Sequence, residues 1–122
     1  MNLLELGCKA CRPGTPALAS DECEKLLGQL HGWQLLNQFG ILQIQKVFLC
    51  RNFKSALELT NALGAIAEQN DHHPLIMLEW GRVTVNWWTH TVNGLHLNDF
   101  VMAAKTDEVA QALLCNRSHM QN

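Results

Sequence analysis

The stretch Asp71-His72-His73-Pro74 separates the longest helical pattern of the chain from its strongest β-strand pattern. Before it, from Phe53 to Gln69, apolar residues recur at intervals of three and four, which predicts a helix with one buried face. After it, apolar and polar residues alternate from Val83 to His90, which predicts a strand. The junction therefore joins two elements of different type, and connections of this kind often carry functional side chains.

Two hairpins are predicted, one on each side of the central helix. After the junction, a short strand at Met77–Trp80 turns at Gly81-Arg82 into the strand Val83–His90. Before the helix, the segments Trp33–Leu36 and Ile41–Cys50 are predicted as strands joined by a glycine-containing turn. Strands joined by such short turns pair antiparallel.

Two further helices complete the pattern, one from Ser20 to Leu30 and one from Asn98 to Leu114. The order α-β-β-α-β-β-α predicts an α+β two-layer sandwich, with a four-stranded antiparallel sheet and three helices on one face. Residues 20–115 would form this single domain, residues 1–19 a flexible N-terminal arm, and residues 116–122 a polar tail. In the central helix, the expected buried stripe is Phe53, Leu57, Thr60, Leu63 or Gly64, and Ala67.

The composition is that of a compact globular protein, with 48% hydrophobic and 16% charged residues. A net charge of −2 and a pI of about 6.3 give no argument for binding nucleic acid or an anionic membrane. No apolar run approaches the roughly 20 residues that span a bilayer. The segment Met1–Leu6 lacks the basic start of a signal peptide, so we expect a cytoplasmic protein.

The chain has five cysteines, and this odd number argues against a closed framework of disulfides. Cys8 and Cys11 have the CxxC spacing found in metal and redox sites. No second such pair and no HxxxH follows to supply the four ligands of a structural zinc ion. The alternatives are an incidental pair of thiols on the N-terminal arm and a redox or metal role.

Three histidines are candidates for proton transfer. His72 and His73 lie at the junction, and His90 ends the predicted strand, which the hairpin brings back to the same end of the sheet. Neighbouring residues of an extended segment point to opposite sides, so His72 and His73 would flank a cleft from different angles. Imidazoles titrate near neutral pH, which suits general acid and base catalysis. The carboxylates that could orient them are Glu68, Asp71 and Asp99.

Other readings of these side chains stay open. Loop histidines are often merely solvated, and two histidines with a carboxylate can bind a metal, although no HExxH spacing is present. No G-x-S-x-G motif or phosphate-binding glycine loop points to another chemistry. Trp87 and Trp88 are expected to pack on opposite faces of the sheet. Trp80 either packs or forms an aromatic wall for a flat heterocycle.

The motif resembles the signature of the pterin-4a-carbinolamine dehydratase family. The elements of that signature fall in the expected order and spacing: Glu68, His72-His73-Pro74, Trp80, His90 and Asp99. The resemblance covers roughly residues 20–115 and includes the order of helices and strands. The segment Glu79–His90 is especially similar to bacterial members of the family.

The resemblance implies a hydro-lyase that needs neither metal nor cofactor and acts on a 4a-hydroxytetrahydropterin, the pterin-4a-carbinolamine. The enzyme expels the 4a-hydroxyl as water and releases quinonoid dihydropterin, which recycles the cofactor of aromatic amino acid hydroxylases. Carried over by position, the catalytic residues are His72, His73 and His90. The substrate-binding and supporting residues are Glu68, Asp71, Pro74, Thr89 and Asp99.

The chain departs from animal members of the family at two places. They have an acid and a tryptophan where this chain has Leu75-Ile76, and a cysteine is expected where it has Val92. Both changes touch the pocket rim near the C6 substituent of the pterin. The open sheet edge favours self-association, so a homodimer or homotetramer is expected. The alternatives to the dehydratase are a non-enzymatic dimerisation or regulatory module on the same fold, and metal-assisted hydrolysis.

Overall fold

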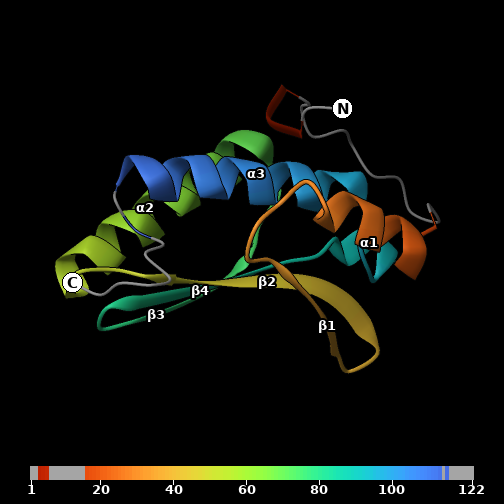
Figure 1. Ribbon diagram of the computed structural model, residues 1–122, viewed down its shortest axis with the longest axis horizontal. Coiled ribbons are helices and arrows are strands. Elements are labelled where there is room, and N and C mark those ends of the chain that lie inside the picture. Colours follow the sequence, from red (N-terminus) through yellow and green to blue (C-terminus); the bar gives the residue numbers. More distant parts are fainter. Residues whose placement is uncertain (1–2, 6–15, 114, 116–122) are drawn as a thin grey trace.

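The computed structural model describes residues 3–5, 16–113 and 115. Its helices and strands follow the order α-β-β-α-β-β-α, as predicted, with a short 3-10 helix before α1 and another before α3 (Figure 1). The elements are η1 (Leu3–Glu5), α1 (Ser20–Leu27), β1 (Gln34–Gln38), β2 (Ile41–Leu49), α2 (Phe53–Asn70), β3 (Leu75–Glu79), β4 (Arg82–Trp87), η2 (His90–Val92) and α3 (Leu97–Ala112).

The four strands form one antiparallel sheet in the order β1-β2-β4-β3, and the helices lie together on one face of it (Figure 1). The predicted fold class is therefore confirmed. In the hairpin of β3 and β4, Leu75 pairs with Asn86 and Glu79 pairs with Arg82. This register places the start of β3 beside the end of β4, so the junction before β3 lies at the same end of the sheet as the segment after Trp87.

The core lies between the sheet and the helices. Val83, Val85 and Trp87 are fully buried in the core, as predicted for one face of β4, while Thr84 and Asn86 on the other face are also buried, at 7% and 1% exposure. The buried stripe predicted for α2 is wrong at its N-terminal half, because the side chains of Phe53 and Leu57 are 46% and 39% exposed. Two overlapping sets of apolar residues fit the helical period, and the sheet buries the other one: Ala56, Leu59, Leu63 and Ala67.

Strand β4 ends at Trp87, three residues before the predicted end at His90. Thr89 and Gly94 exchange two backbone hydrogen bonds, which close a tight loop around the 3-10 helix η2. The alternating pattern continues through Trp88, but this loop turns the backbone away from the sheet. At the other end of the hairpin, the turn is Trp80-Gly81, with a positive φ of 73° at Gly81, instead of the predicted Gly81-Arg82.

Most of the predicted N-terminal arm, including Cys8 and Cys11, lies outside the described residues, as do residues 116–122. Leu3 is buried in the core cluster, and η1 contacts α3. The backbone N–H of Leu18 donates to the carbonyl of Leu95. Within the described segments, no helix is both long and apolar enough to cross a bilayer.

Lys46 is a charged residue on the core face of β2, between Ile44 and Phe48. Its ammonium group donates to Asp107 Oδ1 at 2.8 Å and to the carbonyl of His31 at 2.7 Å. It also lies 5.1 Å from the centre of the Phe48 ring. The other carboxylate oxygen of Asp107 accepts from Trp33 Nε1 at 3.0 Å. Lys46 therefore ties β2 to α3 and to the loop before β1, with its charge paired.

Removing the two partners of this ion pair should have unequal effects on stability. Asp107→Ala leaves a buried ammonium without its counter-charge and should lower the free energy of unfolding by about 2–4 kcal/mol. Lys46→Met removes the buried charge and keeps the volume, while Asp107 stays partly solvated and bonded to Trp33. That change should cost about 1 kcal/mol or less. Urea denaturation measures both, with Glu108→Ala as the control for loss of an exposed carboxylate on α3. Equal losses for the two variants would contradict the asymmetry.

Candidate active site

Helix α2 ends in a turn that aims the two histidines of the junction. Asp71 adopts the left-handed conformation, with φ 50° and ψ 43°, and its N–H bonds back to the carbonyls of Ala67 and Glu68. Aspartate tolerates this conformation better than most non-glycine residues. Residues 72–74 connect α2 to β3 without regular secondary structure, and the imidazoles of His72 and His73 have different partners.

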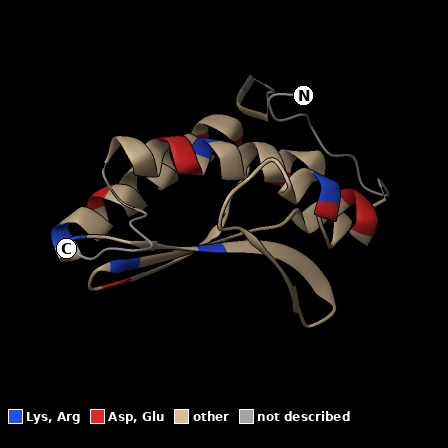
Figure 2. Cartoon of the chain, in the orientation of Figure 1, with Lys and Arg blue, Asp and Glu red and all other residues tan. Residues whose placement is uncertain are grey.

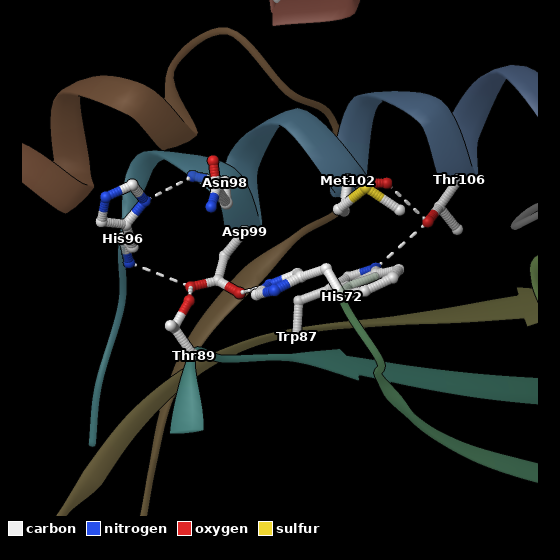
Figure 3. A network of polar contacts seen from close by, with 8 residues as sticks. All are labelled: His72, Trp87, Thr89, His96, Asn98, Asp99, Met102 and Thr106. Carbon is white, nitrogen blue, oxygen red and sulfur yellow. Dashed lines mark hydrogen bonds and ion pairs between the residues drawn. The ribbon is translucent and has the colours of Figure 1, made fainter. Parts of the chain in front are cut away.

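The imidazole of His72 is held beneath the helices by two contacts (Figure 3). Its Nε2 lies 2.7 Å from Asp99 Oδ1. Its ring stacks parallel on the indole of Trp87, with 5.5 Å between ring centres and 3° between the planes. The side chain is only 11% exposed. A carboxylate on one edge and an aromatic plane on one face fix both the position and the orientation of this ring.

Asp99 is fully buried and accepts three hydrogen bonds (Figure 3). Besides Nε2 of His72 on Oδ1, the hydroxyl of Thr89 donates to Oδ2 at 2.7 Å and the backbone N–H of His96 donates to Oδ2 at 2.9 Å. His96 is the N-cap of α3, and its Nδ1 accepts from the N–H of Asn98 at 3.1 Å. Asp99 thus belongs both to the cap of α3 and to the anchor of His72.

The contact with Asp99 determines the tautomer of His72. A carboxylate only accepts, so Nε2 of His72 carries the hydrogen, and in the neutral ring Nδ1 carries the lone pair. In hydrolytic triads and metal sites, a carboxylate on the far nitrogen orients an imidazole in the same way. The arrangement leaves Nδ1 of His72 as the nitrogen that can exchange a proton with a ligand.

Trp87 has a second partner that fixes its indole. Its Nε1 donates to Thr106 Oγ1 at 3.1 Å, and the hydroxyl of Thr106 donates to the carbonyl of Met102 at 2.7 Å (Figure 3). Sequence reasoning put Trp87 and Trp88 on opposite faces without deciding which enters the core. The structure buries Trp87, and its contact with His72 was missed. Thr106 was also missed, although a threonine inside an apolar helix face indicates a buried polar partner.

The other two histidines form separate pairs. His73 Nε2 lies 2.5 Å from Glu68 Oε2, with side chains 54% and 78% exposed. His90, exposed in η2, stacks on Trp88 with 4.7 Å between ring centres and 24° between planes. Trp88 follows Trp87 and lies half-buried, as expected for neighbours on opposite faces. The predicted site residues therefore fall into three groups: His72 with Asp99 and Thr89, His73 with Glu68, and His90 with Trp88.

Three other residues that the sequence singled out, Asp71, Pro74 and Trp80, belong to none of these three groups. Asp71 is exposed as the cap of α2, and Pro74 is half-buried immediately before β3. Trp80 is 71% exposed at the turn of the β3–β4 hairpin. That turn is the opposite end of the hairpin from Leu75 and Asn86, so Trp80 does not line the histidine groups of its own chain.

The described residues contain no group of three or more His, Cys, Asp or Glu side chains placed to hold a metal ion. Within the same residues, every fully buried side-chain nitrogen and oxygen has a hydrogen-bond partner. The buried carboxylate of Asp99 is therefore fully paired in this conformation.

Comparisons with known proteins show which proteins this chain is similar to. A family model described as pterin 4 alpha carbinolamine dehydratase matches residues 16–109, well over half of the chain. The crystal structure of a transcriptional coactivator/pterin dehydratase from Brucella melitensis is 32% identical with a TM-score of 0.70, over 77% of this chain and 98% of that one.

A second solved structure is similar in fold. It is a pterin dehydratase-like protein identified as a RuBisCO assembly factor in the alpha-carboxysome, 21% identical with a TM-score of 0.56. The match covers 66% of this chain and 90% of that one.

Proposed function

The chain belongs to the pterin 4 alpha carbinolamine dehydratase family, and from that premise we propose that it dehydrates a 4a-hydroxytetrahydropterin. The products are quinonoid dihydropterin and water. The observation that carries the proposal is His72, held by Asp99 and stacked on Trp87 so that only one nitrogen is left for proton exchange. Recycling of the pterin cofactor of an aromatic amino acid hydroxylase is the role that this reaction would serve.

The reaction moves one proton in each direction and needs no redox step. The C4a–O bond breaks as the hydroxyl takes up a proton and leaves as water, while a ring N–H adjacent to C4a gives up its proton. General acid and base groups on different sides of a flat ring would perform both transfers, and such groups typically contribute about 10²–10⁴-fold each. His72, His73 and His90 are the proposed acid and base groups.

The surrounding residues have supporting roles in the proposal. Asp99, itself bonded to Thr89, holds His72 in a buried contact, and Glu68 pairs with His73 at the surface. Asp71 and Pro74, on either side of the two histidines, would line the pterin pocket and keep this segment extended. The departures from animal members, Leu75-Ile76 and Val92, would then act on the pterin side chain and leave proton transfer unchanged.

The sheet suggests how the protein assembles. Strands β1 and β3 are the edges of the described sheet, and its open face carries exposed Val47, Leu75 and Met77. A homodimer or homotetramer that covers these groups is part of the proposal. Acidic and basic residues are interspersed in the view of Figure 2, as the net charge of −2 suggests, so a nucleic-acid partner is not proposed. We also propose that residues 20–115 are the functional domain and that the protein acts in the cytoplasm.

A non-enzymatic role on the same fold is the competing proposal. The structural relative identified as a RuBisCO assembly factor is called pterin dehydratase-like, so this fold also serves assembly. An assembly module would have no need of an imidazole held by a buried carboxylate. The His72–Asp99 pair therefore favours the enzyme.

The direct test is dehydration of a 4a-hydroxytetrahydropterin generated in situ by an aromatic amino acid hydroxylase. Quinonoid dihydropterin, followed by its absorbance, should form at least about 10²-fold faster per active site than without the protein. Treating the protein with a strong chelator, which is removed before the assay, should leave the rate unchanged, because the described residues contain no group of three His, Cys, Asp or Glu side chains placed to hold a metal ion. Pterin binding, read from tryptophan fluorescence, completes the test. Absence of both binding and acceleration would favour the assembly role, and loss of activity on chelation would favour metal-assisted chemistry.

A further inference from the structure

Two buried cysteines meet far from the histidine groups. Cys50 follows the last residue of β2 and Cys115 lies just beyond the end of α3, yet their Sγ atoms are 2.8 Å apart. Each residue is 4% exposed. The N–H of Cys50 donates to the carbonyl of Gly81 at 2.8 Å, and the N–H of Cys115 donates to the carbonyl of Ala110 at 2.9 Å. Both backbones are therefore anchored where the sulfur atoms touch.

We propose that Cys50 and Cys115 are an oxidisable dithiol, and that their disulfide fastens the C-terminal end of α3 to the end of β2. A disulfide needs a sulfur–sulfur distance of about 2.05 Å, so closure requires a movement of less than about 1 Å. The oxidant is a low-molecular-weight disulfide. This inference does not depend on the proposed function.

The pairing is specific among the described cysteines. Cys23, the third of them, is buried on α1, where burial first, and then the charges of Glu22 and Asp99, raise the pKa of its thiol. Asp99 lies in the first turn of α3, whereas Cys115 follows its last turn. The length of α3, 16 residues or about 24 Å, separates the two ends. Cys23 is therefore a matched buried cysteine that should stay reduced.

The chemistry balances as two successive thiol–disulfide exchanges. The Cys115 thiolate attacks the small disulfide RSSR, which forms a mixed disulfide and releases RS⁻. Cys50 Sγ then attacks Cys115 Sγ, which releases the second RS⁻. The two electrons pass to RSSR, and the protons of the two protein thiols convert both RS⁻ groups to RSH.

Burial and the hydrogen bond to Cys115 raise the pKa of Cys50 to about 12, which makes it the poorer first nucleophile at neutral pH. The disulfide should therefore form slowly.

The disulfide should have a large effect on stability and little effect on the histidine groups. It joins residues that are 65 apart in sequence, and constraining a loop of that length in the unfolded chain should raise Tm by about 10 °C. The Asp99 end of α3, with His72 bound to it, lies at the other end of the helix. The arrangement of the histidine groups should therefore be the same in the reduced and oxidised protein.

The test uses the full chain equilibrated in glutathione buffers from fully reduced to fully oxidised. Free thiols are then trapped by alkylation, and cross-linked peptides are identified by mass spectrometry. The expected result is one internal cross-link between Cys50 and Cys115, a mass loss of two hydrogens, and the rise in Tm, all reversed by dithiothreitol. Cys8→Ser/Cys11→Ser serves as the background, because that pair could form its own disulfide.

Three variants in this background test whether the cross-link joins Cys50 to Cys115. Cys50→Ala and Cys115→Ala should each abolish the cross-link and the rise in Tm, whereas Cys23→Ala should keep both. If Cys50→Ala fails to fold, Cys115→Ala still carries the test, because Cys115 follows the last helix whereas Cys50 lies between β2 and α2. Free Cys50 and Cys115 across the whole buffer range would overturn the proposal. So would a cross-link to another cysteine, or a rise in Tm that survives Cys115→Ala.

Discussion

Replacing His72 with alanine should lower kcat for dehydration of the 4a-hydroxypterin by about 10²–10⁴-fold, with a much smaller change in KM. The reason is the geometry of this ring, which Asp99 and Trp87 hold with one nitrogen free. Alanine removes the proton carrier but leaves Asp99 bonded to Thr89 and to the N–H of His96. The cap of α3 should survive, so the loss should appear as slower chemistry in a folded protein.

The control for this experiment is His31→Ala. The His31 side chain is exposed, and only its backbone carbonyl has a structural role, as an acceptor for Lys46. The control should keep wild-type kcat and Tm. Steady-state kinetics with the hydroxylase-generated substrate measures kcat and KM, and circular dichroism measures Tm. A His72→Ala protein that folds normally and keeps wild-type kcat would remove His72 from the mechanism.

The sequence predicted the arrangement of elements around the junction because each signal was local. The helical period before Asp71, the alternation after Pro74 and the glycines between strands each depend on neighbouring residues. The contacts of His72 depend instead on residues far along the chain, and Trp87 reaches it only through the register that pairs Leu75 with Asn86. No local sequence pattern encodes that register. The stacking of His72 on Trp87 was therefore missed, although the sequence placed His72 at the junction and Trp87 on the strand.

Two of the errors along the strands and helices have the same physical origin. The alternation of β4 continues through Trp88, but the bridge between Thr89 and Gly94 ends the strand earlier. In α2, two sets of apolar residues satisfy the helical period, and packing against the sheet selects the set that leaves Phe53 and Leu57 exposed. In both cases the local sequence fits two structures equally well, two ends for the strand or two buried faces for the helix, and a long-range contact selects one of them.

Asp99 links the fold to the proposed chemistry, because its two oxygen atoms serve different partners. Oδ2 accepts from Thr89 and from the N–H of His96, which fixes the start of α3. Among the described residues, Oδ1 accepts from His72 alone. A substitution that changes only the Oδ1 side should therefore separate the role of Asp99 in catalysis from its role in capping the helix.

Asp99→Asn makes that separation. Its amide oxygen can take the place of Oδ2 and keep both bonds of the cap, while its NH2 group faces His72 in place of Oδ1. Because the amide then donates, Nε2 of His72 must accept and the ring hydrogen moves to Nδ1, the nitrogen proposed to serve the substrate. The equivalent change in the Ser-His-Asp triad lowers kcat by about 10⁴-fold through the wrong tautomer. We expect a loss of about 10³–10⁴-fold here, with the free energy of unfolding lowered by only about 1 kcal/mol.

Asp99→Ala is the matched variant, and it should give the opposite balance of effects. It leaves the buried donors of Thr89, His96 and His72 without their acceptor, so the free energy of unfolding should fall by about 3 kcal/mol or more. Nitrogen-15 NMR of the histidine rings reads the tautomer directly: hydrogen on Nε2 of His72 in the wild type, and on Nδ1 in Asp99→Asn. Wild-type kcat in Asp99→Asn, with the tautomer changed, would show that the state of His72 does not control the reaction. An unchanged tautomer would instead contradict the assignment of Oδ1 as its anchor.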